Sequence, residues 1–363
     1  MRYQKIQNPD KHHHIRTQWD ELWRWSSASN PNSRFDNLIS ACQRFYGGKV
    51  ELHCVYEGEC LVAAIPLVED TFRQLSVATL PNNEWGYWGD LLVHPQFRTS
   101  DAFDFLAGNL IRNTKGILEL RYINAVEFRW QQLIHAIEKL GTVIRSGKFE
   151  VGMINHAADV EQFYSGLSKS FRKKLRKYHR ELSKLGNVEF EYLSKPGKEK
   201  LKNVMAEIFE LEQAGWKGRE NSSINDQQMD EFFCEQASLL AEAGHLAIGT
   251  LRLDGRLVAF EFGNLSKKIY SSWKIGYDES LSRLAPGHII ADYMVREFHS
   301  AGNCVQQDTI GPVSTATSKW TSTSLVRSRC FAAGSSLRAR LLVSAMRVAG
   351  RAKRMLGRIG SSR

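Results

Sequence analysis

Residues 245–264 read HLAIGTLRLDGRLVAFEFGN, and this stretch decides the fold. Two mostly apolar runs, 245–253 and 256–264, flank the dipeptide Asp254-Gly255. An Asp-Gly pair between such runs predicts a two-residue β-hairpin, because both turn positions need a positive φ. A third run, 268–275, predicts another strand directly after the hairpin. The stretch therefore predicts an antiparallel β-meander.

Helices are predicted on both sides of this meander. Before it, the 3.6-residue period predicts a helix that ends near Gly215, from the apolar residues Leu201, Val204, Met205, Ile208 and Phe209. After it, Pro286-Gly287 opens another amphipathic helix, since proline loses no hydrogen bond in the first helical turn. The free N–H groups and positive dipole end of such a terminus suit a pyrophosphate. A simple turn of the chain is the alternative for this dipeptide.

The first half of the chain repeats a similar order of elements. Runs 52–56 and 61–67 flank Glu57-Gly58 and predict a second hairpin. The pattern then predicts a strand over 87–93, a helix over 102–113, a strand over 117–123, a helix over 130–140 and β-structure over 142–154. The two turn dipeptides lie 197 residues apart, which fits tandem domains of equal size.

Composition is that of a globular protein with a sizeable core. The 363 residues are 42% hydrophobic and 24% charged, which predicts two domains. No apolar run has the length of a membrane span, and the N-terminus has no apolar signal core. The six cysteines show no metal or disulfide spacing, which predicts reduced thiols in a cytoplasmic protein. His12, His13 and His14 lack ligand partners at metal-binding spacing and are interpreted as part of a polar arm, so no metal is expected.

The net charge of +10 comes from the C-terminal end of the chain, where the excess of bases over acids lies. From Thr321 onward there are ten Lys and Arg residues and no acid, which leaves 39 bases and 39 acids before it. Residues 335–358 predict a basic amphipathic helix. One face carries Arg340, Arg347, Arg351, Arg354 and Arg358, and another carries Leu341, Ala345, Val348, Ala352, Met355 and Ile359. We expect this helix either to cover the second domain or to contact an anionic membrane surface.

A second basic helix is predicted over 168–185. Lys and Arg residues surround its apolar stripe, against the single acid Glu181. A nucleic-acid-binding surface is one interpretation, but RNA binding usually also needs exposed aromatic residues or a known module. The sequence favours a solvated basic face that lines a cleft for an anionic ligand.

Taken together, these motifs resemble the GNAT acyltransferase fold. More narrowly, they resemble the acetyltransferase family named for cellulose biosynthesis (the CelD/BcsL type), which is related to the FemAB transferases. The resemblance rests on residues 168–176, 212–218, 250–255 and 286–287, on Asp308 and Lys319, and in the first half on Trp19, Leu22, 64–67 and 86–92. The wider fold's acyl-CoA signature is replaced here by Arg283-Leu-Ala-Pro-Gly-His288.

The resemblance implies an α/β (α+β) fold with two tandem GNAT-like domains. Each domain would be a mixed, mostly antiparallel sheet flanked by helices. The expected division is a polar N-terminal arm (1–14), an N-terminal GNAT-like domain (15–157), a C-terminal acyltransferase domain (158–330) and a basic helical tail (331–363).

The implied activity is acyl-CoA-dependent N-acyl transfer, with acetyl-CoA or another acyl-CoA as co-substrate. The acceptor would be a sugar, an amino sugar or a cell-envelope or exopolysaccharide precursor. One alternative is a FemAB-like transferase that uses aminoacyl-tRNA, for which the basic helix is the sequence support. Another is a catalytically silent scaffold in polysaccharide synthesis.

Ten residues are candidates for the site of this chemistry. Acyl transfer to an amine needs a held donor, a base and stabilisation of the developing oxyanion. Asp308, Glu212 and Tyr277 are the catalytic candidates. Arg283, Pro286, Gly287 and His288 are candidates for donor binding, and Trp216, Lys217 and Lys319 for acceptor binding. For each single carboxylate the alternative is a solvated or salt-bridged acid, and for Trp216 and Tyr277 it is packing.

Overall fold

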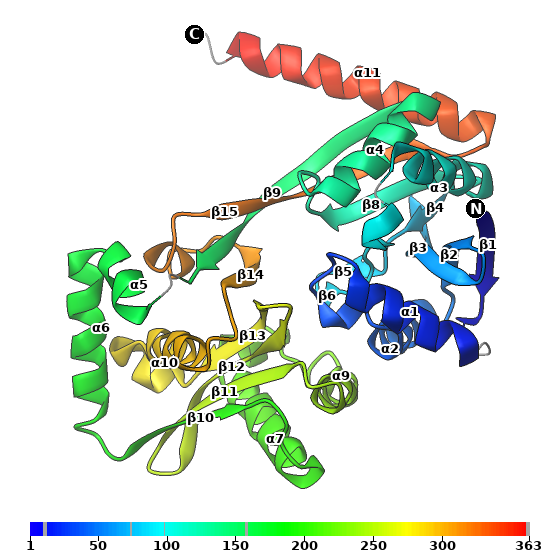
Figure 1. Ribbon diagram of the computed structural model, residues 1–363. Coiled ribbons are helices and arrows are strands. Elements are labelled where there is room, and N and C mark those ends of the chain that lie inside the picture. Colours follow the sequence, from blue (N-terminus) through cyan, green and yellow to red (C-terminus); the bar gives the residue numbers. More distant parts are fainter. Residues whose placement is uncertain (10–12, 73–74, 98, 157–158, 361–363) are drawn as a thin grey trace. The chain divides into compact units, whose positions relative to one another are not determined.

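The computed structural model describes residues 1–9, 13–72, 75–97, 99–156 and 159–360 (Figure 1). The chain forms two compact units. Unit 1 comprises Met1–Ala28, Ser33–Phe149 and Val326–Arg363, and unit 2 comprises Ser29–Asn32 and Glu150–Leu325. Each unit combines β-sheet with flanking helices, so the expected fold class of two mixed α/β domains is confirmed.

Unit 1 contains a mixed sheet in the order β1-β2-β3-β4-β8-β15, with β7 beside β3. The strands are β1 (Arg2–Gln7), β2 (Glu51–Glu57), β3 (Cys60–Phe72), β4 (Leu75–Thr79), β7 (Leu92–Val93), β8 (Ile117–Ile123) and β15 (Ser324–Ala333). β4 and β8 run parallel, whereas β1 with β2, β2 with β3, β3 with β4, β3 with β7 and β8 with β15 are antiparallel. The helices are α1 (His13–Trp25), α2 (Phe35–Tyr46), α3 (Ser100–Asn113) and α4 (Phe128–Leu140). The predicted hairpin at Glu57-Gly58 is confirmed, with Gly58 at φ 57°.

The predicted polar arm over 1–14 is wrong for its first part, because Arg2–Gln7 forms β1. This strand pairs with β2 along its whole length, and its Ile6 is buried. Lys5 Nζ donates to Glu51 Oε1 at 3.0 Å, so its polar residues have partners on the neighbouring strand. His12 lies outside the described residues, and α1 begins at His13.

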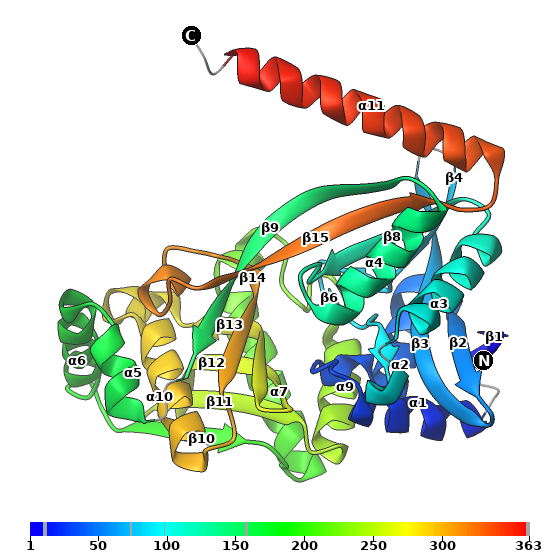
Figure 2. The same ribbon diagram turned by 45° about the horizontal axis from the view of Figure 1, so that its top comes forward.

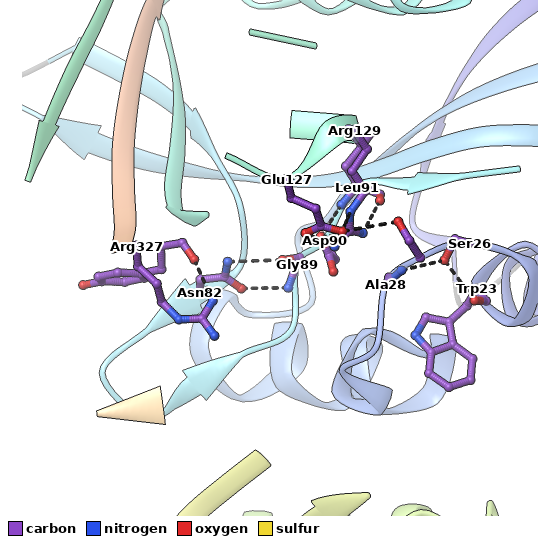
Figure 3. A network of polar contacts seen from close by, with 12 residues as sticks. Trp23, Ser26, Ala28, Asn82, Gly89, Asp90, Leu91, Glu127, Arg129 and Arg327 are labelled. Carbon is purple, nitrogen blue, oxygen red and sulfur yellow. Dashed lines mark hydrogen bonds and ion pairs between the residues drawn. The ribbon is translucent and has the colours of Figure 1, made fainter. Parts of the chain in front are cut away.

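The single strand predicted over 87–93 is also wrong. Two short strands, β6 (Gly86–Tyr87, paired with β5, Asn82–Asn83) and β7, are separated by a loop. The Asn82 side chain fixes this loop, because its Oδ1 accepts the N–H of Trp88 at 2.9 Å and that of Gly89 at 2.8 Å. Figure 3 shows the contact between Asn82 and Gly89. The next residue, Asp90, pairs with the buried Arg129 at 3.0 Å. These polar contacts replace the ladder that a continuous strand would have made.

The predicted domain boundary at 330 is wrong as well. Residues 328–333 of β15 pair with β8, and Cys330 and Ala332 are buried in the core of unit 1. The helix that follows, α11 (Leu337–Gly360), begins in the same unit. Its Val343 packs against Val77 and Ile117, so the start of this helix does not cover the second domain.

Unit 2 contains the predicted meander. Its strands lie in the order β9 (Val143–Asn155), β14 (Gln306–Pro312), β13 (Ile269–Tyr277), β12 (Arg256–Ser266), β11 (Leu246–Leu253) and β10 (Val188–Leu193). The helices are α5 (Val160–Gly166), α6 (Lys169–Leu182), α7 (Lys198–Ala214), α8 (Trp216–Arg219), α9 (Asp230–Glu242) and α10 (Pro286–Ala301). The hairpin turn has the predicted geometry, with Asp254 at φ 50° and Gly255 at φ 78°.

Helix α10 lies beside the strands of the meander (Figure 2), and apolar side chains pack it against them. Ile289 and Ile290 pack with Leu251 and Val258, and further along the helix Phe298 packs with other buried residues of the sheet. This packing fixes the start of α10 beside the end of β13. Within the described residues, no helix is long and apolar enough to cross a membrane.

Candidate active site

Unit 2 contains a pocket of about 630 Å³. Its walls are the end of α7, the start of α8, residues 272–277 of β13, Glu261 of β12, Gln307 and Thr309 of β14, the start of α10 and the segment 314–320. Its volume lies within the range of about 300–1,000 Å³ that is typical of small-molecule sites.

The pocket exists because β13 and β14 part from each other. Their parallel pairing covers only Ile269–Ser271 with Gln306–Asp308, although β13 continues to Tyr277. Beyond Asp308, the pairing of β14 with β9 is irregular, and Ile310 has a positive φ of 56°. The two strands therefore leave a gap in the sheet, and pocket-lining side chains come from both.

The Glu261 carboxyl, which the sequence analysis missed, lines this pocket from β12. It is only 1% exposed, and Gln307 Nε2 donates to its Oε1 at 3.2 Å. Burial raises the pKa of this carboxyl, because an ionised carboxylate is poorly solvated there. A buried acid with a shifted pKa in a pocket is a candidate for proton transfer. The signal in the sequence is a lone carboxylate between Phe260 and Phe262 in an apolar strand.

The second missed residue is Lys274 on β13. Its ammonium lies 5.2 Å from the centre of the Phe233 ring. Burial, and after it the positive charge of Lys217, lower the pKa of Lys274 to about 8. A lysine in this state can hold a proton at neutral pH and release it without a large cost. In the sequence it stands between Trp273 and Ile275, again as a polar interruption of an apolar strand.

Two of the predicted site residues, Glu212 and Lys217, lie in the pocket wall and form an ion pair with each other. Glu212 is buried at the end of α7, and its other oxygen accepts the N–H of Ile224 at 2.8 Å. Both oxygens therefore have partners in the protein. This arrangement favours a positioning role for Glu212, which ties α7, α8 and the following loop together.

The start of α10 borders the pocket. Ala285 precedes it with a left-handed backbone (φ 49°), and Pro286 occupies the first turn. Gly287 and His288 line the pocket. A Cβ atom added at Gly287 would lie 3.4 Å from the Tyr277 ring, which is ordinary contact, so the backbone here approaches Tyr277 closely without strain.

His288 is held by the segment before β15. The indole N–H of Trp320 donates to His288 Nδ1 at 3.1 Å, and the Phe171 ring centre lies 5.2 Å from that of His288. Burial, followed by the positive charge of Lys319, lowers the pKa of His288. Lys319 itself is exposed and is absent from the pocket wall, whereas the neighbouring Trp320 is part of it.

Asp308 and Arg283 also lie outside the pocket wall. Asp308 is buried, and its Oδ1 accepts the N–H of Ile310 at 2.7 Å, which stabilises the irregular end of β14. Gln307 and Thr309, on either side of it, are the residues of β14 that reach the pocket. Arg283 is exposed in the short 3-10 helix Glu279–Leu284.

Aromatic rings form the outer part of the pocket. Trp216 and Tyr277 both line it and are both exposed to solvent. The N–H of Trp216 donates to Glu279 Oε1 at 2.8 Å, which fixes the start of α8. No group of three or more His, Cys, Asp or Glu side chains suited to a metal ion occurs among the described residues.

Comparison with known proteins locates a GNAT domain within unit 2. Residues 169–306 match the family model of the acetyltransferase (GNAT) domain. This range contains Glu212, Glu261, Lys274, Tyr277 and the start of α10. The chain thus carries a GNAT-type acyltransferase domain, as the sequence predicted. No curated protein matches the chain.

Solved structures show the same fold over nearly the whole chain. FemX is 9% identical with a TM-score of 0.60, covering 91% of this chain and 97% of that chain. A conserved protein of unknown function from Bacteroides thetaiotaomicron is 11% identical with a TM-score of 0.57, covering 87% and 97%. The C-terminal domain of a putative lysylphosphatidylglycerol synthetase from Agrobacterium fabrum is 11% identical with a TM-score of 0.56, covering 93% and 96%. At these identities the likeness concerns the fold alone.

Proposed function

We propose that this chain is an acyl-CoA-dependent N-acyltransferase, with acetyl-CoA as the first donor to test. The observation that carries the proposal is the pocket in which the buried Glu261 carboxyl, the Lys274 ammonium and the start of α10 meet. The acceptor would be an amine on a sugar, an amino sugar or a cell-envelope or exopolysaccharide precursor, as in the cellulose-biosynthesis type of acetyltransferase that the sequence resembles.

The donor side of the pocket suits a pyrophosphate-bearing thioester. The Gly287 N–H and the positive dipole end of α10 would hold the pyrophosphate, since Pro286 has no N–H and those of His288 and Ile289 donate to the Ala285 carbonyl oxygen. Gly287 lines the pocket without a side chain, so a ligand can approach this backbone. The positive charge of Lys274 favours an anionic ligand at the pocket wall, whereas that of Lys217 is paired with Glu212.

The chemistry needs a base for the acceptor amine and an acid for the leaving thiolate. Glu261 in its ionised form would accept a proton from the amine, whose nitrogen then forms a bond to the acyl carbon. The bond from that carbon to sulfur breaks, and the thiolate takes a proton from the Lys274 ammonium or the Tyr277 hydroxyl. Because burial raises its pKa, the Glu261 carboxylate is a stronger base than one in water.

The acceptor side favours a ring-shaped substrate. Trp216 and Tyr277 present exposed aromatic faces at the pocket. Such faces provide apolar contact area beside polar edges, which matches a sugar ring carrying hydroxyl groups.

Six free cysteines also support an enzyme of a reducing, cytoplasmic compartment.

A second candidate function is aminoacyl transfer from tRNA, for which α6 is the supporting observation. Its Phe171 and Leu175 are buried, whereas five bases are exposed and make no ion pair with any described residue: Lys169, Lys173, Lys174, Arg176 and Lys177. Such a face would bind a phosphate backbone.

Calorimetric titration tests the two donors. We expect acetyl-CoA to bind the intact protein, and Gly287→Glu to weaken this binding by at least about tenfold, because the new carboxylate would enter the pocket and repel the pyrophosphate. Gly108→Glu is the matched control, since a Cβ at this helical glycine of unit 1 meets no atom within 4 Å.

The outcomes separate the candidates. Acetyl-CoA binding that is equal in both variants would place the donor site elsewhere. Binding of tRNA, with none of acetyl-CoA or longer acyl-CoAs, would favour the aminoacyl donor. Binding of neither donor would leave the catalytically silent scaffold.

A further inference from the structure

Helix α11 has two opposite apolar faces, and only one of them is packed. Ala339 and Val343 are fully buried against unit 1. Leu337, Leu341 and Val348 are 72%, 64% and 68% exposed. An exposed leucine is ordinary when it stands alone, but three large apolar side chains on one helix call for a common explanation.

The three exposed residues form one stripe. At about 100° of rotation per residue, Leu337, Leu341 and Val348 fall within about 40° of one another. By the same geometry, the middle of this stripe lies roughly opposite the buried Ala339 and Val343. The fold of unit 1 therefore cannot cover the stripe by the contacts it already makes with this helix.

Arginines border the stripe on both sides. Arg338 lies on one side of it, and Arg340 and Arg347 lie on the other, and all three are exposed. None of them makes an ion pair with a described residue, and the sequence has no acid after Glu297 apart from Asp308. The helix thus combines a narrow apolar line with an uncompensated positive charge.

We propose that this stripe, Leu337–Leu341–Val348, rests on the surface of an anionic lipid bilayer, with α11 parallel to the membrane plane. Its leucines and valine would enter the boundary between headgroups and acyl chains, and its arginines would contact lipid phosphates. A second copy of the chain is a poorer occupant, because two such helices would bring arginines against arginines. The lipid surface supplies both the apolar layer and the negative charge.

Cosedimentation with vesicles tests the proposal on the full chain. We expect the protein to pellet at low salt with vesicles of phosphatidylcholine and phosphatidylglycerol, and to remain in solution with phosphatidylcholine alone. Replacing one basic residue near an anionic surface lowers binding by about fivefold, so Arg340→Gln and Arg347→Gln should each have that effect. High salt should release the protein, because it screens these charges.

The apolar part is tested by Leu341→Glu/Val348→Glu, which should reduce vesicle binding by at least about tenfold. The matched control is Leu140→Glu/Val126→Glu, which makes the same changes at residues of unit 1 that are 54% and 67% exposed. Both double variants should keep the wild-type melting temperature.

Three results would overturn the proposal. The first is that the wild-type protein stays in solution with anionic vesicles, and the second is that the two double variants bind vesicles equally well. The third is that Leu341→Glu/Val348→Glu has a lower sedimentation coefficient than the wild type in the absence of lipid, which would identify the stripe as a contact between copies of the chain. The test measures no acyl transfer, so it stands or falls independently of the proposed function.

Discussion

Glu261→Gln separates catalysis from folding in this chain. The substitution keeps the shape of the side chain and an oxygen that can still accept the amide N–H of Gln307, now 3.2 Å away. It removes only the group that can take a proton. A positioned general base contributes roughly 10²–10⁴-fold to the rate, so we expect turnover to fall by that factor, or about 3–5 kcal/mol in the barrier.

The same substitution should not harm stability at neutral pH. Burial raises the folded-state pKa of Glu261, so the native state binds this proton more tightly than the unfolded state does. Between the unfolded and folded pKa values, the native protein therefore loses stability as pH rises. Glutamine carries no charge at any pH, so the variant should lack this loss and should be no less stable than the wild type above the folded pKa.

The assay is release of free thiol from acetyl-CoA at several acceptor concentrations, paired with urea unfolding at several pH values. In the variant, the acidic limb of the pH profile of kcat/KM should vanish. The control is Glu212→Gln, which changes another buried glutamate of the same pocket but breaks its ion pair with Lys217. We expect that control to lose stability and to keep more turnover than Glu261→Gln. The reverse order of turnover losses would refute the assignment of Glu261 as the base.

Three further predictions concern other residues of unit 2. Lys217→Met should lower the free energy of unfolding by about 3 kcal/mol, because it strands the buried Glu212 carboxylate. His156→Phe should flatten the pH dependence of stability: burial lowers the pKa of His156 from 6.5 to about 4, so the wild type loses up to about 3 kcal/mol as pH falls through this window. Asp308→Asn should reduce turnover far less than Glu261→Gln does, since the amide oxygen can still accept the Ile310 N–H.

Each of these predictions has a matched comparison. Lys200→Met breaks the exposed pair with Glu191 and should cost less than about 1 kcal/mol in urea unfolding. His135→Phe makes the same change at an exposed histidine of unit 1 and is the comparison for the pH profile of stability. The first argument is contradicted if the two lysine variants lose the same free energy of unfolding. The second is contradicted if the two histidine variants have the same pH profile of stability. The third is contradicted if Asp308→Asn loses as much turnover as Glu261→Gln.

The local elements of unit 2 could be predicted from the sequence, because their causes are local. Asp254-Gly255 needs a left-handed backbone at both positions, and the structure has one there. The apolar period of α7 and the proline at the start of α10 likewise depend only on neighbouring residues. The resemblance carried by these motifs led to the GNAT acetyltransferase domain that residues 169–306 match.

The pocket could be predicted only in part, because it depends on strand register. Successive strand residues alternate between the faces of a sheet, so a shift of one position replaces Gln307 with Asp308 at the pocket wall. Glu261 and Lys274 were visible as polar interruptions of apolar strands. These two side chains line a cavity because β13 and β14 separate after Ser271. No local sequence pattern encodes this separation.

Long-range pairing decided the end of the chain. The sequence predicted that residues 335–358 form a helix with one basic and one apolar side, and α11 is helical over most of this range. It could not predict that residues 328–333 pair with β8, about two hundred positions earlier, or that Val343 packs against Val77 and Ile117. The periodicity of a helix defines its faces, but only its tertiary neighbours determine which face is buried and which stays in contact with solvent.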